Sequence, residues 1–532
     1  MNRKTLVLPA LAGLLAPALA ACGGTSGGAS GGDAIVVGTT DTFAVTEDSP
    51  APFDPAAGYD VSAWNIMRNT FQTLVRPPRS GTEPEMEAAE KCEFTDEVGE
   101  QYRCTLREGL TFSNGHDLTA EDVEFSVRRM LDIGFELGPA SLLSNIDRVQ
   151  ATSDTEVVFH LRKPDATFPY KLATPAAAIL DSESYPRKSF REGYEIAGSG
   201  PYRIDSFDEE AGRAVLARNE DYEGTLDVRN DRIELRFFDS SRTMEKALRD
   251  GGIDVMSRSI SPEQVVRLRN NDDDAIELVE SPGQEIRYLV FDTSRSTAGQ
   301  RAVRAAMAQV VDRKALVRDV YRRTAEPLYS MVPSGLVGHR NSFFNEYGEP
   351  DPAAARELLE EAGVETPVKL TLHYTTDHYG AVTRDEFEAL RTQLDATGLF
   401  DTDIQGVPWK EYRPAAAEGA YEVYGFGWFP DFPDADNFIA PFLAEDNFLK
   451  LPYVSEEIRE DVIPRTRRET NRAASAAAFG RAQDILARDV PLLPLWQGKQ
   501  YLAAREDITG VEWALNSASV LQLWELGRGV QG

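Results

Sequence analysis

Helix-like and strand-like patterns alternate through the roughly 500 residues that follow a short apolar leader. A chain of this length is too long to fold around a single hydrophobic core. Residues 34–38, 156–161 and 286–291 have the β-branched and aromatic runs of buried strands. Residues 118–131 and 300–321 carry apolar side chains at helical spacing. The alternation predicts an α/β fold divided into at least two lobes.

The leader predicts export. Arg3 and Lys4 precede an apolar run at 6–19, which is too short for a membrane span and is typical of a secretory signal. It ends in Leu-Ala-Ala before Cys22, which resembles a bacterial lipobox. We therefore expect residues 1–21 to be removed and Cys22 to be acylated, with residues 22–33 forming a flexible Gly/Ser tether. The alternative is an ordinary secretory signal with an incidental cysteine.

The formal net charge is −31, or −33 without Arg3 and Lys4. Nucleic-acid binding requires clustered basic residues, so this balance argues against a nucleic-acid partner. The hydrophobic fraction of 42% is sufficient for packed cores. The acidic surface favours solubility and does not identify a ligand.

With Cys22 assigned to lipid, two cysteines remain in an oxidising compartment, Cys92 and Cys104. The polar residues between them favour a hairpin that brings the sulfurs together. A loop of this length contributes about 3 kcal/mol in the chain-entropy estimate. A zinc site is the weaker alternative, because only His116 lies nearby and four ligands are needed. We predict a disulfide, no metal and no cofactor.

Several short blocks occur in a fixed order along residues 35 to about 525, and together they resemble the family 5 extracellular solute-binding proteins of ABC importers. The blocks lie at residues 53–55, 69–75, 102–115, 118–123, 198–202, 218–222, 303–313, 427–434 and 490–495. Most of them are interpreted as scaffold turns and helices rather than ligand contacts.

The resemblance implies a periplasmic-binding-protein-like fold with a ligand cleft between two lobes. Lobe I would comprise residues 34–285 and 500–532, with an extra subdomain at about 76–200. Lobe II would comprise residues 286–499. The chain would cross between the lobes near residues 282–286 and 496–501, and the cleft would close by a hinge motion. The resemblance also implies a membrane permease as partner, and we expect a monomer.

A peptide ligand needs a buried acid for its ammonium and backbone groups for its amides. In peptide-binding relatives the acid follows a Gly-Trp pair, which places it at Asp431 here, beside Trp428 and Phe429. The backbone groups would come from Gly427 and Trp428 in lobe II and, in lobe I, from Tyr59, Asp60 and Val61. The alternative for Asp431 is a solvated turn, since Asp434 and Asp436 crowd the same segment.

The partner of a ligand carboxylate is not evident. Dipeptide binders have an arginine on the strand that aligns with residues 370–379, and this stretch has none. His378 is the nearest substitute, with His339 and Arg340 as further candidates. The difference argues against a strict dipeptide preference. A metal site at His373 and His378 is disfavoured because their spacing suits neither a helix face nor a strand face.

These patterns predict a non-enzymatic lipoprotein on the outer face of the cell membrane, which captures short peptides or peptide-like solutes for import. The sequence has no G-x-S-x-G, H-E-x-x-H, Walker or G-x-G-x-x-G motif in a fitting context. The alternatives are a binder of a nickel chelate, glutathione or an oligosaccharide, and a surface receptor for signalling peptides.

Overall fold

The computed structural model describes residues 34–270, 275–380, 382–445, 447 and 449–529. The leader, Cys22 and the tether lie outside the described residues, so acylation of Cys22 stays a prediction. Across the described ranges, no helix is both long and apolar enough to span a membrane.

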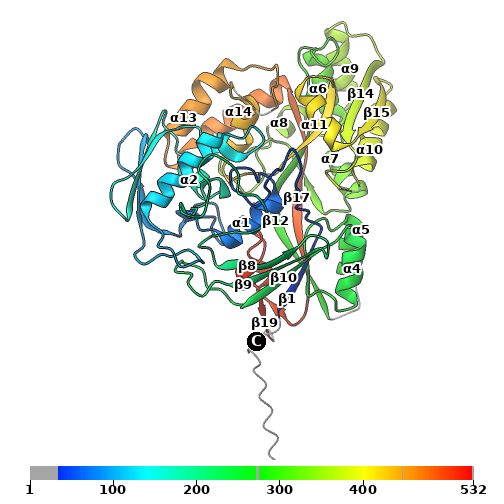
Figure 1. Ribbon diagram of the computed structural model, residues 1–532. Coiled ribbons are helices and arrows are strands. Elements are labelled where there is room, and N and C mark those ends of the chain that lie inside the picture. Colours follow the sequence, from blue (N-terminus) through cyan, green and yellow to red (C-terminus); the bar gives the residue numbers. More distant parts are fainter. Residues whose placement is uncertain (1–33, 271–274, 381, 446, 448, 530–532) are drawn as a thin grey trace, which may run out of the picture.

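An eleven-stranded mixed sheet extends through the molecule (Figure 1). Its strands lie in the order β15 (Phe400–Val407), β14 (Val368–Thr375), β16 (Val423–Trp428), β12 (Ile276–Phe291), β17 (Leu492–Arg505), β11 (Val255–Met256), β1 (Ile35–Thr39), β10 (Arg232–Phe237), β9 (Arg213–Arg218) and β8 (Tyr202–Asp208), and β13 (Ala325–Pro327) pairs with β17. The strands alternate with helices along the chain, and the predicted α/β fold is confirmed.

The long strands β12 and β17 join the two ends of this sheet. Residues 276–282 pair with 499–505, next to β11 and β1, whereas residues 286–290 pair with 492–497, next to β16. The pairing register shifts between Pro282 and Ile286. Figure 1 shows the two strands side by side, with β14 and β15 toward one end and β1, β9 and β10 toward the other.

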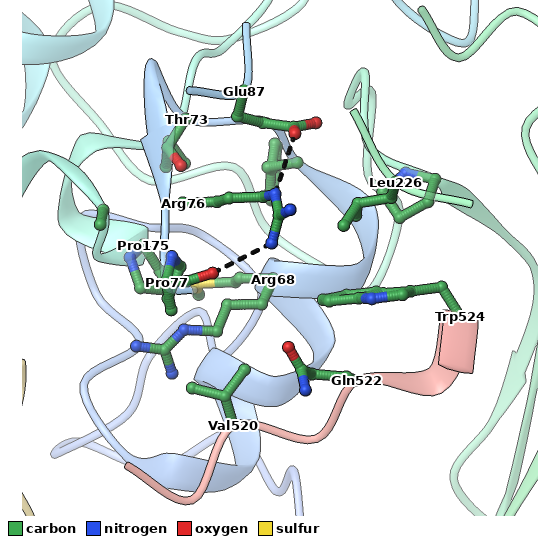
Figure 2. A pocket seen from close by; sticks show the side chains of 15 residues that line it. Arg68, Thr73, Arg76, Pro77, Glu87, Pro175, Leu226, Val520, Gln522 and Trp524 are labelled. Carbon is green, nitrogen blue, oxygen red and sulfur yellow. Dashed lines mark hydrogen bonds and ion pairs between the residues drawn. The ribbon is translucent and has the colours of Figure 1, made fainter. Parts of the chain in front are cut away.

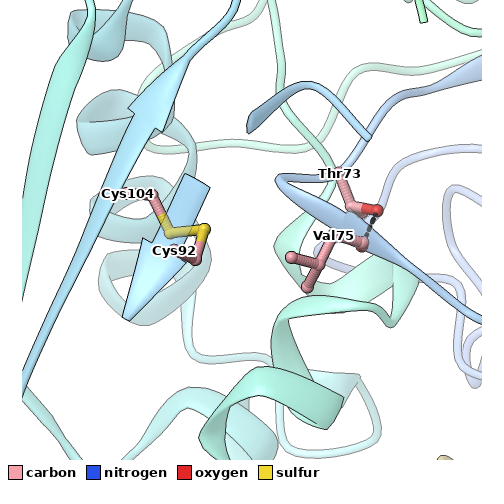
Figure 3. Close-up of a disulfide and its surroundings, with 4 residues drawn as sticks. All are labelled: Thr73, Val75, Cys92 and Cys104. Atoms are coloured by element: carbon pink, nitrogen blue, oxygen red, sulfur yellow. Dashed lines mark hydrogen bonds between the residues drawn. A yellow bond between two sulfur atoms is a disulfide. The ribbon is translucent and has the colours of Figure 1, made fainter. Parts of the chain in front are cut away.

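A second sheet, with strands in the order β4 (Ala89–Phe94), β5 (Gln101–Leu106), β7 (Glu156–Leu161) and β6 (Ile146–Ala151), lies beside the first and packs against α2 (Ala120–Ile133). Cys92 and Cys104 face each other on β4 and β5 and form a disulfide (Figure 3). Two-stranded sheets are formed by β2 (Val75–Arg76) with β3 (Glu85–Met86) and by β18 (Ile508–Thr509) with β19 (Gly527–Arg528).

The other helices mostly cover the sheets. They are α1 (Val61–Thr70), α3 (Phe168–Leu172), α4 (Ser241–Arg249), α5 (Pro262–Arg269), α6 (Arg301–Val310), α7 (Arg313–Ala315), α8 (Ser342–Tyr347), α9 (Pro352–Glu361), α10 (Thr383–Ala396), α11 (Trp409–Ala417), α12 (Ala440–Leu443), α13 (Ile463–Arg468) and α14 (Ala476–Asp489). The prediction of one long helix at 300–321 is wrong in one respect, because the helix ends with α6 at Val310. There the carboxylate of Asp312 accepts a hydrogen bond from the Ala315 amide and starts a new helix.

Candidate binding site around Asp431

Asp431 lies in the loop that follows β16. One carboxylate oxygen accepts a hydrogen bond from the Tyr59 hydroxyl at 2.9 Å, and the other accepts one from the Asn437 amide at 3.0 Å. The Asn437 carbonyl oxygen accepts from the Asp431 backbone amide at 2.9 Å and from the Trp428 indole at 3.2 Å. Asp431 is only 8% exposed, so the solvated turn considered from the sequence is wrong.

The neighbours of Asp431 leave its charge only partly compensated. Burial raises the pKa of Asp431, and this effect outweighs the opposing influence of the Asn437 and Tyr59 hydrogen bonds and of the positive charge on Arg68. Burial, followed by the negative charge of Asp431, raises the pKa of Tyr59 well above its usual value, so the phenol stays protonated and donates. A buried carboxylate held by neutral donors is suited to receive a cation.

Tyr59 brings the predicted lobe I to this carboxylate. Its ring packs against Trp64 of α1, with ring centres 5.4 Å apart. A second contact between the same regions is the hydrogen bond from the Ala166 amide to the Arg467 carbonyl, at 2.7 Å. The structure therefore has Asp431 enclosed between segments that are distant in sequence.

Asp60 and Val61 form the beginning of α1 rather than an extended edge. The Asp60 side chain caps the helix through the Ala63 amide at 2.9 Å, and its carbonyl accepts from the Trp64 amide. The Asp60 carbonyl is therefore already engaged. The contribution of Tyr59 to this site is its hydroxyl rather than its backbone.

Gly427 and Trp428 lie at the end of β16, past the residues that pair with β14. On one side β16 pairs with β12, and Gly427 is opposite Arg287. On the other side β14 pairs only as far as Tyr424. Beyond that point the described residues supply no strand partner. A side chain at Gly427 would collide with the Arg287 guanidinium, because a β-carbon there would lie 2.2 Å from its nitrogen.

Arg287 is a buried cation at the base of this edge that the sequence analysis did not identify. It forms an ion pair with Glu285, and its guanidinium carbon lies 4.0 Å from the ring centre of Tyr379 and 5.2 Å from that of Trp496. A charged residue inside the apolar run 286–291 was the available signal. Its burial depends on aromatic residues from distant segments, which the run does not reveal.

His378 precedes Tyr379 in the chain and does not provide a cation. Its ring stacks on Trp409 with centres 3.8 Å apart and planes 4° apart. The surrounding protein and the positive charge of Arg287 lower the pKa of His378, although part of the side chain is exposed. The imidazole is therefore neutral at pH 7, which makes His378 a poor partner for a carboxylate.

Two other arginines, Arg258 and Arg413, are better candidates for binding a ligand carboxylate. Arg258 forms an ion pair with Asp41 at 3.0 Å and stands at a backbone φ of 67°, next to Ser259 at 49°. Two successive non-glycine residues in the left-handed region mark a strained turn of the kind that occurs at binding sites. Arg413 is one helical turn after Trp409 on α11, and its charge acts on both Tyr59 and His378.

The remaining candidates have local partners. His339 bonds the Val332 carbonyl, and Arg340 pairs with Asp484 of α14 at 2.8 Å. His373 stacks on Tyr421, with ring centres 4.3 Å apart. In the part of the chain that the structure describes, no group of three or more His, Cys, Asp or Glu residues could hold a metal ion.

An enclosed carboxylate beside the end of a strand is an arrangement suited to holding a small solute. Residues 83–450 match the bacterial extracellular solute-binding proteins, family 5, and the chain belongs to this family of non-enzymatic binders. The resemblance seen in the sequence is thereby confirmed.

Among its relatives, the dipeptide-binding protein of Pseudomonas aeruginosa is 24% identical over 87% of this chain and 91% of its own. The glutathione-binding protein GsiB of Escherichia coli K12 is 26% identical over 86% and 89%. Of the solved structures, the Helicobacter pylori protein DppA in complex with the peptide STSA has a TM-score of 0.77 at 22% identity, covering 94% of this chain and 98% of that one. A Pseudoalteromonas dipeptide-binding protein with Met-Leu has a TM-score of 0.78 at 20% identity, covering 93% and 100%.

Proposed function

We propose that this protein captures short peptides outside the cell and delivers them to a membrane ABC permease. The observation that carries the proposal is Asp431, a carboxylate 8% exposed and held by the neutral side chains of Tyr59 and Asn437. A peptide ammonium would supply the missing charge through a charge-assisted hydrogen bond in a site of low polarity.

The end of β16 supports a ligand in extended conformation. Among the described residues, the strand pairing of Gly427 is on the β12 side only. A peptide added there would pair its backbone with the strand. Because backbone hydrogen bonds do not depend on the side chains, this mode of binding accepts peptides of many sequences. The Gly427 amide donates a hydrogen bond to the Tyr379 hydroxyl oxygen, so a peptide that paired with this amide would displace the phenol.

Arg258 and Arg413 would bind the carboxylate at the carboxyl terminus of the peptide. The positive charges of Arg258 and Arg413 both lower the pKa of His378, which supports a common role for the two side chains. They would replace the arginine that is absent from residues 370–379. Because they come from different parts of the chain, binding a carboxylate between them would favour closure of the predicted lobes about the β12–β17 crossing.

We further propose anchoring through an acylated Cys22, with the binding body held on the outer face of the membrane by the tether. The lipobox-like sequence supports this arrangement. Mass spectrometry of the mature protein tests it: a diacylglyceryl mass on an N-terminal Cys22 is expected, and an unmodified chain that begins elsewhere would contradict it.

Native mass spectrometry of protein purified without refolding tests the ligand class. We expect bound masses that fragment as short peptides and that disappear after partial unfolding and dialysis. A copurified oligosaccharide or nickel chelate in their place would refute the assignment. Calorimetric titration with a panel of di-, tri- and tetrapeptides would then establish the preferred length.

A further inference from the structure

Arg68 acts electrostatically on Asp431, and among the described residues it forms no ion pair with a carboxylate. It lies on α1 one turn after Trp64, and its guanidinium carbon is 4.9 Å from the Trp64 ring centre. Within the described chain, its buried Nε has no hydrogen-bond partner. Trp64 in turn contacts Tyr59, whose hydroxyl is bound to Asp431. The positive charge of Arg68 is close enough to lower the pKa of Asp431.

Arg68 also borders a cavity beneath α1, shown in Figure 2. The cavity has about 500 Å³ of empty space, including its open mouth, and much of its wall is apolar, from Met67, Phe71 and Pro175 to Trp524. Figure 2 shows a second arginine there, Arg76, bound to Glu87 and the Pro77 carbonyl, whereas no such contact is drawn for Arg68. The described residues thus supply anionic and carbonyl partners to Arg76 and none to the Nε of Arg68.

The balance of charges around Asp431 would change if a peptide ammonium bound there. In the free protein, the nearby positive charge of Arg68 partly compensates Asp431. Lys171 also acts on Asp431 but has its own partner, Asp165, at 2.6 Å. An ammonium paired with Asp431 would neutralise this carboxylate and leave the Arg68 guanidinium without the partial compensation it now has, and an uncompensated charge in a buried site is costly. A second carboxylate, carried by the ligand, would restore the balance.

We propose that Arg68 is a specificity-determining residue that reads a carboxylate on the amino-terminal residue of the ligand, next to the ammonium held by Asp431. The inference rests on the proposed peptide-binding function and narrows it. Two chemical sources provide this pair of charges. One is a peptide that begins with Asp or Glu. The other is a γ-glutamyl peptide, in which the ammonium and the carboxylate are both attached to the α-carbon of the glutamyl residue.

Three tripeptides of equal length separate these sources: α-Glu-Ala-Gly, γ-Glu-Ala-Gly and Gln-Ala-Gly. The last has the size of the first but lacks the extra charge. Calorimetric titration of the full chain should give an affinity at least about tenfold higher for one or both glutamyl peptides than for Gln-Ala-Gly, because each charge-assisted contact contributes on this scale. The glutamyl peptide that binds more tightly shows which of the two kinds of peptide carries the carboxylate bound by Arg68.

Variants assign the preference to Arg68. In Arg68→Met the preference for the glutamyl peptides should disappear while Gln-Ala-Gly still binds. In Arg68→Lys, which keeps the charge, it should be partly retained. Arg79→Met is the matched control, since Arg79 also stacks on a tryptophan, Trp513 at 4.3 Å, but pairs with Glu525 at 3.0 Å. It should leave the preference unchanged.

Equal binding of all three peptides by the wild type, or tighter binding of Gln-Ala-Gly, would overturn the inference and leave the proposed function intact. A preference that survives in Arg68→Met would overturn the assignment to Arg68. If none of these peptides, nor any of the wider panel, bound to the wild type, the proposed function itself would fail.

Discussion

Three aspartates within six residues of one loop differ sharply in their partners. Asp434 accepts two hydrogen bonds from the Arg472 guanidinium, at 2.7 and 2.8 Å, and Asp436 accepts two from Arg467, at 3.1 and 3.2 Å. Asp431 is equally buried, yet its hydrogen bonds come from Tyr59 and Asn437. No lysine or arginine of the described residues forms an ion pair with it.

This difference distinguishes carboxylates that stabilise the fold through ion pairs from a carboxylate that is available to a ligand. The pairs of Asp434 and Asp436 are complete, so these carboxylates hold the loop against α13 and its neighbours. The site of Asp431 is incomplete, and burial raises its pKa because no full countercharge is present. The predictions below test whether the two kinds of carboxylate behave differently.

The largest effect is expected for Asp434→Asn. This change leaves the Arg472 guanidinium, which is 5% exposed, without its countercharge. Removing one partner of a buried pair costs about 3–5 kcal/mol of unfolding free energy. Urea denaturation of the ligand-free protein measures it. Asp431→Asn, which breaks no ion pair, is the control and should cause no comparable loss; equal losses in both variants would remove the distinction.

The pH dependence of peptide affinity should follow the protonation of Asp431. Its pKa in the free protein is raised, and only the ionised form attracts an ammonium. Affinity should therefore be constant above this pKa and fall by up to about tenfold per pH unit below it. Titration calorimetry from pH 7 downward checks this. An Asp431→Asn variant with the same pH profile would show that another group is responsible.

The stability of the ligand-free protein should change in the opposite sense. The folded state binds the Asp431 proton more tightly than the unfolded chain, so this group destabilises the protein as the pH rises through the window between the unfolded and folded pKa values. The unfolding free energy of the wild type relative to that of Asp431→Asn should decline across that window. A difference that stays flat, or rises with pH, would contradict the raised pKa.

The smallest effect is expected for Tyr59→Phe. The variant removes one hydrogen bond to Asp431 and keeps the ring packed on Trp64. The loss is about 1 kcal/mol of affinity, typical of a single neutral hydrogen bond. The same peptide titration measures it. A loss as large as that of Asp431→Asn would mean that the phenol, not the carboxylate, is the principal contact.

The sequence predicted the parts of the fold that depend on local pattern. The strand at residues 156–161 coincides with β7, and the helix predicted at 118–131 is α2, where the Asp122 carboxylate accepts a hydrogen bond from the Thr119 amide at 2.9 Å. The strand predicted at 286–291 is only the end of β12, because residues 276–282, which lack a continuous apolar run, are also held in the strand by pairing with β17.

The site was predicted less completely for a related reason. Asp431 and Gly427 belong to one short block, so the resemblance could locate them. Arg68, Arg258 and Arg287 come from three separate segments and acquire a role only through neighbours that the fold brings together. His378 was chosen by position in the sequence, and its stacking on Trp409 could not be inferred from that position.

The central claim, that Asp431 reads the amino terminus of the ligand, is tested most directly by a double-mutant cycle. Wild type and Asp431→Asn are each titrated with one tight-binding peptide and with its N-acetylated form. Each single change should cost roughly 3 kcal/mol or more of affinity, because a buried charge loses its partner. The account predicts that the two changes together cost little more than either alone. Independent, additive losses would contradict it and would place the ammonium elsewhere in the cleft.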